Sequence, residues 1–312
     1  LMERYALPEI AAGYRGREKL QKYILDKQVL DNRVLWIKGM NASQEKRWLQ
    51  FCRDYVPVKD SDGRFVLEAR WTDKENERRN LAVIRYGDTI KRYDLTLFNS
   101  IYLNREKGTY SAIWQQYAAV MCALLCNTDA ETSQAFMDTC DFTAEEPIIG
   151  MRKIAADGAY LRRAESSNLH ILSLVHKESI SAIDAQIWKA QLQVLFPLLE
   201  IERVSFIKRY RKQVQEALGE KYHDFRTGRS QYIYQFGETV SDPDNAELGT
   251  IYRMTKLRRD ADAYQYLLYI PDEQSRSRIE LLHDLRNSLA HGNTCAIDKV
   301  IEFINGHPFD WN

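Results

Sequence analysis

The pattern of apolar residues changes near residue 109, and this change divides the chain into two kinds of structure. Before it, short apolar runs alternate with one amphipathic stretch over residues 43–55. Four runs have the composition of strands: Arg33–Ile37, Phe65–Trp71, Leu81–Tyr86 and Leu95–Tyr102. A strand, a helix and a second strand in succession are typical of a crossover connection. We therefore predict an α/β domain over residues 1–108 with a small, partly parallel sheet.

Helical spacing dominates after residue 109. Apolar positions recur every three or four residues over residues 113–125 and again from Ser179 to Leu218, where Pro197 is expected to cause a kink. A stretch rich in loop residues, 222–245, separates these from further helices predicted over 248–269 and 297–304. We predict a helical connecting region, 109–178, and a helical bundle, 179–312. The expected fold class is α+β, mostly α.

The composition limits the partners that suit this chain. The 312 residues include 44 basic and 44 acidic side chains, so any contact with RNA must be local. Five dispersed cysteines without a C-x-x-C pair favour reduced thiols and a cytoplasmic protein, and we expect neither a membrane span nor a secretory leader. Asp88 with Asp94 is interpreted as a polar turn, and His170 with His176 as surface or packing residues. We expect no metal and no other cofactor.

One helix near the carboxyl end carries residues suited to phosphodiester chemistry. Its start is predicted at Ser277–Glu280, which has the form of a capping box, and its end at Gly292. Its apolar stripe consists of Ile279, Leu282, Leu285 and Leu289. Near its end stand Arg286, Asn287 and His291. Arginine can neutralise a phosphate, an amide can orient it, and histidine can exchange a proton near neutral pH.

The spacing R-N-x-x-x-H resembles the terminal motif of HEPN domains, helical modules of bacterial toxins, CRISPR-associated ribonucleases and defence proteins. The resemblance covers about the last hundred residues at most. It implies metal-independent cleavage of RNA in a defence or toxin setting. His291 would be the general acid or base, Arg286 would stabilise charge on the phosphate, and Asn287 would orient either.

Arg286 and His291 point about 140° apart on a regular helix. They can cooperate only if the last turn unwinds before Gly292 or if a second copy of the chain supplies partners. HEPN ribonucleases are similar in that two motifs meet across a dimer. We therefore expect a homodimer.

A second interpretation of the same helix stays open. The motif also occurs in HEPN relatives with no evident nuclease role. Arg286 would then pair internally, for example with Asp284 or Glu280, and His291 would cap its helix. The chain would be a non-catalytic interaction or regulatory module of a larger STAND-like assembly, of which this sequence is a fragment.

Basic and aromatic residues alternate in a stretch before the motif helix. Four cations are the candidates for RNA binding: Arg253, Lys256, Arg258 and Arg259. The tyrosines nearby in the sequence are Tyr232, Tyr234, Tyr252 and Tyr264. Phosphates suit the cations and unpaired bases stack on the rings, a pattern typical of single-stranded RNA binding. The other interpretation is a solvated helix face whose cations are balanced by nearby acids.

The amino-terminal part resembles the entry to the nucleotide-binding domain of STAND-type ATPases, because Gly16-Arg17-Glu18 precedes a candidate strand that runs into Gly39. A phosphate loop has the form G-x-x-x-x-G-K-[ST], but here Gln44 replaces the second glycine and Glu45 the lysine. A carboxylate at that position repels phosphates. Three alternatives follow: a degenerate domain, the second half of a domain whose phosphate loop lies upstream, and an unrelated α/β domain.

Overall fold

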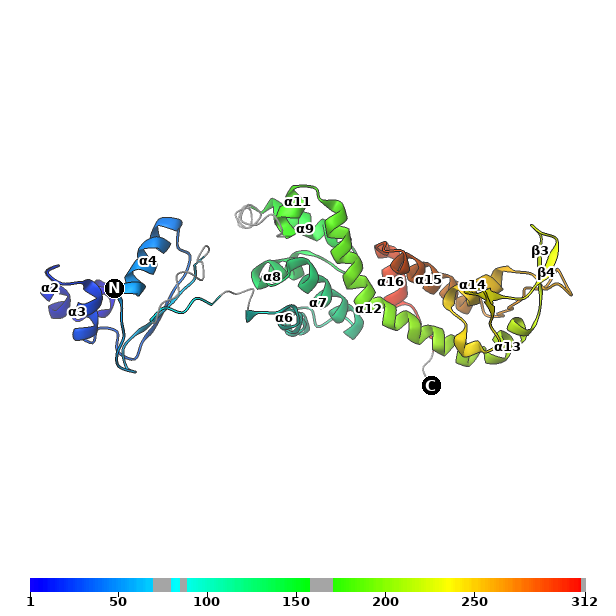
Figure 1. Ribbon diagram of the computed structural model, residues 1–312, viewed down its shortest axis with the longest axis horizontal. Coiled ribbons are helices and arrows are strands. Elements are labelled where there is room, and N and C mark those ends of the chain that lie inside the picture. The colour runs from blue at the N-terminus through cyan, green and yellow to red at the C-terminus, as the bar shows by residue number, and fades with distance from the viewer. Residues whose placement is uncertain (70–79, 85–88, 158–170, 310–312) are drawn as a thin grey trace. The chain divides into compact units, whose positions relative to one another are not determined.

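The computed structural model describes residues 1–69, 80–84, 89–157 and 171–309. The chain divides into two compact units, Leu1–Thr89 and Ile90–Asn312 (Figure 1). Most of the described residues are helical, and a parallel pair of strands precedes the helices of the second unit. The predicted fold class, α+β and mostly α, is confirmed. No described helix combines the length and the apolar character that crossing a membrane requires.

The first unit contains the predicted crossover. β1 (Val34–Ile37) and β2 (Arg64–Leu67) pair in parallel, and α4 (Ala42–Asp54) connects them. Three short helices precede β1: α1 (Met2–Tyr5), α2 (Pro8–Gly13) and α3 (Leu20–Asp26). One small core joins α3, the sheet and the end of α4 through Ile24, Val29, Leu30, Leu35 and Tyr55. Leu35 lies opposite Phe65 in the sheet, so α4 and both strands are fixed by the same apolar contacts.

Two of the four predicted strands differ in the structure. Leu95–Tyr102 lies within helix α6 (Arg92–Glu106), which belongs to the second unit. Leu97 and Ile101 are exposed while Leu95 is buried, so α6 carries apolar residues on two sides. A continuous apolar run of this kind is also typical of a buried strand, which explains the wrong prediction. Residues 81–84 form no strand. The ends of two predicted strands, Trp71 and Tyr86, lie outside the described residues, as do Asp88 and His170.

The second unit is built along α12 (Ile180–Arg209), which continues through Pro197 without a break (Figure 1). The helices that precede it are α6, α7 (Ala112–Cys126), α8 (Ala130–Thr139), α9 (Pro147–Ala156) and α11 (Ile171–His176). Those that follow are α13 (Arg211–Gly219), α14 (Leu248–Lys256), α15 (Glu273–Ala290) and α16 (Ile297–Asn305). All of them contribute to one continuous apolar core. Residues 109–178 therefore share their core with residues 179–312.

Two contacts show how α15, the helix that carries the motif, lies against α12. Trp188, in the first half of α12, donates its indole N–H to the carbonyl of Leu289 at 2.8 Å. Glu202, near the end of α12, pairs with Arg278 near the start of α15. The two helices are therefore antiparallel.

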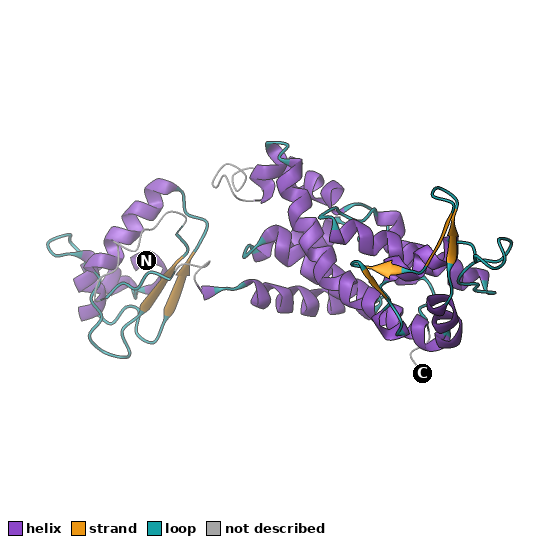
Figure 2. Cartoon of the chain, turned by 45° about the vertical axis from the view of Figure 1, so that its right-hand side comes forward, coloured by secondary structure: helices purple, strands orange, loops and turns teal. Residues whose placement is uncertain are grey.

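Small hairpins occupy the stretch in which the sequence indicated only loops (Figure 2). β3 (Tyr222–Asp224) pairs with β4 (Arg229–Gln231), and β5 (Tyr234–Gln235) pairs with β6 (Glu238–Thr239), both antiparallel. A 3-10 turn, η2 (Pro243–Asn245), follows. The helix predicted over 248–269 ends at Lys256, and single bridges join Arg258 to Tyr266 and Tyr222 to Arg259. Asp262 explains part of this difference, because its carboxylate accepts the N–H of Tyr264 and favours a turn.

Candidate functional site

The N-cap of the motif helix α15 lies five residues earlier than the sequence predicts. Asp272 caps it by accepting the N–H of Ser275 at 2.9 Å, and the Ser277–Glu280 capping box is not used. Pro271 explains the earlier start, because a proline directly before an aspartate ends the preceding segment there. The predicted apolar stripe is fully buried: Ile279, Leu282, Leu285 and Leu289. This burial fixes which side of α15 faces solvent.

The end of α15 is regular up to its last residue, Ala290. Asn293 donates its N–H to Ser288 O at 2.9 Å, and Gly292 donates to Leu289 O at 3.2 Å. These two bonds, with Gly292 at φ +77°, form a Schellman turn, which needs a residue tolerant of positive φ. The last turn therefore does not unwind before Gly292.

Gln191 fixes the segment that follows α15. Its buried side-chain amide donates to the carbonyl of Cys295 at 2.9 Å and accepts the N–H of Cys295 at 2.7 Å. It also donates to the hydroxyl of Tyr117 at 3.3 Å. With Trp188 bound to Leu289, α12 thus holds the motif helix and the next loop at three backbone atoms. Burial raises the pKa of the Cys295 thiol to about 12, so this neighbour of the motif stays protonated and is not a nucleophile.

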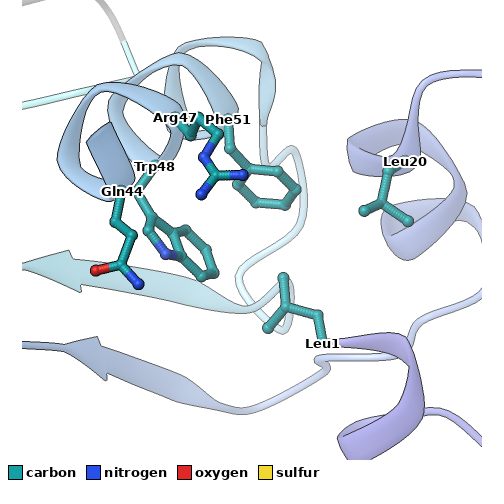
Figure 3. Close-up of a pocket in the computed structure, with 6 residues that line it drawn as sticks. All are labelled: Leu1, Leu20, Gln44, Arg47, Trp48 and Phe51. Carbon is teal, nitrogen blue, oxygen red and sulfur yellow. The ribbon is translucent and has the colours of Figure 1, made fainter. Parts of the chain in front are cut away.

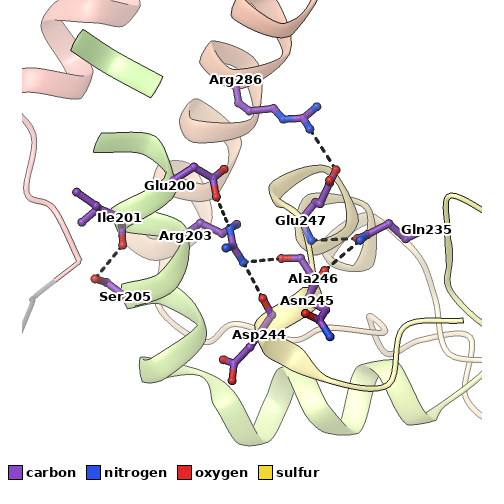
Figure 4. Close-up of polar contacts among 10 residues, drawn as sticks. All are labelled: Glu200, Ile201, Arg203, Ser205, Gln235, Asp244, Asn245, Ala246, Glu247 and Arg286. Carbon is purple, nitrogen blue, oxygen red and sulfur yellow. Dashed lines mark hydrogen bonds and ion pairs between the residues drawn. The ribbon is translucent and has the colours of Figure 1, made fainter. Parts of the chain in front are cut away.

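The three motif residues are not brought together within one chain. Asn287 and His291 are exposed, and their spacing of four places them on the same side of the helix. Arg286 points instead toward α14, where its Nη2 donates to the carboxylate of Glu247 at 3.1 Å (Figure 4). The two side chains of this ion pair are 29% and 37% exposed, so water reaches both.

The two acidic residues that the sequence suggested as partners of Arg286 form ion pairs with lysines instead. Asp284 pairs with Lys299 at 2.6 Å, and this hydrogen bond holds the pKa of Asp284 below its usual value. Glu280 pairs with Lys256 at 3.3 Å. Glu247, which lies 39 residues before Arg286, has no local sequence signal that would identify it as the partner.

A polar network stands behind Glu247 and fixes its position (Figure 4). The side-chain oxygen of Gln235 accepts the N–H of Glu247 at 3.0 Å, and its nitrogen donates to Asn245 O at 3.0 Å. Arg203, on α12, donates to Ala246 O at 3.0 Å and to Glu200 at 2.8 Å. Residues of α12 and β5 therefore hold the loop before α14. This loop contains Glu247, whose carboxylate binds Arg286.

Each of the four predicted RNA-binding cations already has an internal contact. Arg253 donates to the Tyr222 hydroxyl at 2.8 Å, and Arg258 lies 3.7 Å above the centre of the Tyr266 ring. Lys256 and Arg259 pair with acids, Glu280 at 3.3 Å and Glu220 at 3.1 Å. The four cations extend from α14 into the following loop.

The amino end of α4, where a phosphate loop would bind its ligand, is closed by its own side chains. Asn41 accepts the N–H of Gln44 at 2.9 Å, and Gln44 accepts the N–H of Asn41 at 3.0 Å. A pocket of about 380 Å³ lies beside it, and its lining is mostly apolar (Figure 3). The lining residues are Leu1, Leu20, Gln44, Arg47, Trp48 and Phe51. Two backbone N–H groups at this end, those of Asn41 and Gln44, are thus already used.

We expect no binding of ATP to this chain. Glu45 takes the place of the phosphate-loop lysine, and the capping box uses the N–H groups of Asn41 and Gln44. Calorimetry with ATP and magnesium should give a flat trace. The variant Asn41→Ala, which frees an N–H of Gln44, should also give a flat trace, because the glutamate remains. Binding at micromolar concentration would contradict this interpretation of residues 39–46.

The described residues contain no group of three or more histidine, cysteine or carboxylate side chains that could hold a metal ion. Comparison with protein-family models, curated proteins and solved structures finds no match for the chain.

Proposed function

We propose that the helical unit cleaves RNA without a metal ion, at a site that two copies of the chain complete. The observation that carries this proposal is the exposure of Asn287 and His291 at the rigid end of α15. Their side chains make no hydrogen bond within residues 1–69, 80–84, 89–157 and 171–309, although α12 fixes the backbone on which they stand. Polar side chains without internal partners keep their hydrogen-bonding groups available for a ligand.

The chemistry follows from the residue types. His291 takes the proton of a ribose 2′-hydroxyl, and the resulting oxygen attacks the adjacent phosphorus. The bond from phosphorus to the 5′-oxygen breaks, and this leaving oxygen takes up the proton from the imidazolium of His291, which restores the neutral histidine. Arg286 stabilises the extra negative charge of the pentacoordinate intermediate. The products are a 2′,3′-cyclic phosphate and a 5′-hydroxyl.

A second copy is required because α15 stays helical up to its end. Arg286 and His291 of one chain point about 140° apart, so the two side chains do not face the same phosphate. Pairing Arg286 of one copy with His291 of the other across a two-fold axis removes this difficulty. The remaining N–H groups of Arg286 stay available, since only Nη2 binds Glu247.

The experiment that tests this proposal is cleavage of an unstructured RNA in the presence of EDTA. We expect cutting to persist, because no step uses a metal, and the upstream product to end in a 2′,3′-cyclic phosphate. DNA of the same sequence should stay intact, because it lacks the attacking hydroxyl. RNA that remains whole, or cutting that EDTA abolishes, would contradict the proposal.

The ion pair between Arg286 and Glu247 favours a second candidate, a non-catalytic interaction or regulatory module. Arg286 would then serve to hold α15 against the loop before α14. In that case the wild-type chain leaves RNA intact. The cleavage assay therefore separates the two candidates directly.

A further inference from the structure

Residues 220–270 expose a distinctive set of side chains. All seven large hydrophobic residues that are exposed there are phenylalanine or tyrosine. Exposed valine, leucine and isoleucine occur elsewhere, for example on α6. Flat rings at a surface stack on unpaired bases, and the contact tolerates any sequence because every base has a flat face. A surface whose exposed large hydrophobic residues are all aromatic suits a single-stranded nucleic acid, whose bases can stack on the rings.

Phe236 is the most unusual member of this set. It lies at the tip of the β5–β6 hairpin, where Gln235 pairs with Glu238 and leaves a turn of two residues. Phe236 has φ +55° and Gly237 has φ +86°, so the turn has the positive φ values of type I′. Asparagine suits the first of these positions, whereas a bulky side chain there is strained. The other described non-glycine residues with positive φ are Gln28, Asn32, Asn127 and Glu178, none of them aromatic.

The ring of Phe236 gains no stabilising burial that would offset this backbone strain. The residue is 85% exposed, so its apolar surface stays in water. Tyr234, on the same hairpin, is 50% exposed and offers a second ring. Neither burial nor the geometry of the turn favours a phenylalanine at this position. Contact of the exposed ring with a ligand would explain its presence.

The hairpin is connected to the motif arginine through Glu247, which contacts both Gln235 and Arg286 (Figure 4). Gln235, next to Phe236, accepts the N–H of Glu247 at 3.0 Å and the hydroxyl of Thr250 at 2.7 Å. Glu247 in turn binds Arg286 at 3.1 Å. The hairpin tip is therefore held in a defined position relative to Arg286.

We propose that Phe236 is a base-stacking residue for single-stranded RNA whose backbone phosphate lies at Arg286. This inference rests on the proposed function, because it takes the phosphate position from the role given to Arg286. Phe236 supplies affinity through its ring and does not take part in the chemical step.

The test measures binding of a labelled 2′-O-methyl RNA, which cannot be cut because its 2′-oxygen carries no proton. Phe236→Asn removes the ring and keeps a residue that the turn favours. We expect its affinity to fall about tenfold or more, as for the loss of one stacked base. Its melting temperature should be unchanged or higher. Phe236→Trp should keep wild-type affinity.

The matched control is Phe225→Asn, which removes a ring that is 71% exposed in the loop of the other hairpin. We expect this variant to bind like the wild type. Wild-type affinity in Phe236→Asn, equal losses in both variants, or no binding by the wild type would each overturn the inference. Binding that depends on Phe236 would support it even if natural RNA stays whole, a result that would reject only the proposed cleavage.

Discussion

Replacing Arg278 by alanine is expected to lower the free energy of unfolding of the helical unit by about 3–5 kcal/mol, the usual loss when one partner of a buried ion pair is removed. The side chains of Arg278 and Glu202 are only 7% and 5% exposed, and they form a two-bond ion pair. Arg278 also donates to Phe303 O at 3.0 Å, so it joins α12, α15 and α16. Its loss leaves the Glu202 carboxylate buried without a countercharge. Urea denaturation should show the change as a lower midpoint.

Arg276→Ala is the control, because Arg276 stands on the same helix and is exposed, and its guanidinium donates to the backbone carbonyls of Ile270 and Pro271. We expect that change to cost about 1 kcal/mol or less. A double variant, Glu202→Leu with Arg278→Met, should recover much of the lost stability, since apolar replacements remove both charges together. Equal effects of Arg278→Ala and Arg276→Ala would show that the pair is not buried.

Neither Arg286→Ala nor His291→Ala should cut RNA alone, whereas a heterodimer of the two should show about half of the wild-type rate. The reason is that a two-fold dimer has two composite sites. In the heterodimer, one site combines the intact arginine of one chain with the intact histidine of the other, and the second site lacks both. The heterodimer can be isolated by placing a different affinity tag on each variant.

Two controls make this result interpretable. Light scattering should give about twice the chain mass of 36.6 kDa for every variant. Both single variants should melt close to the wild type, because the Arg286–Glu247 pair is partly exposed and is expected to contribute about 1 kcal/mol or less. An inactive heterodimer of the correct mass would reject the exchange of residues between copies. Cutting by His291→Ala alone would reject the proposed role of this histidine.

The spacing of apolar residues correctly predicted several helices and strands whose own sequence repeats with the period of that structure. The crossover of β1, α4 and β2 followed from two apolar runs and one amphipathic stretch, and α15 and α16 followed from apolar residues at helical spacing. α6 was predicted as a strand because its exposed Leu97 and Ile101 hide the helical period. The start of α15 was misplaced because two capping signals compete, and Asp272 directly follows a proline.

The surroundings of the motif could not be predicted in the same way. The sequence identified Arg286, Asn287 and His291, but it gave no means to find Glu247 or Gln191 as their neighbours. Hydrogen bonds such as that from Gln191 to Cys295 join residues 104 positions apart, and packing alone decides which pairs meet. The hairpin tip at Phe236 was missed because a phenylalanine is not a turn signal.

The continuous core of the helical unit also determines when this protein can fold during its synthesis. Trp114, in α7, donates to the side chain of Asn305, in α16, across 191 positions of sequence. At a translation rate of about 5–20 residues per second, roughly 10–40 s separate the appearance of these two residues. Until then the apolar faces of α7 and α12 lack their final cover, so the helical unit can complete its core only after α16 has been synthesised.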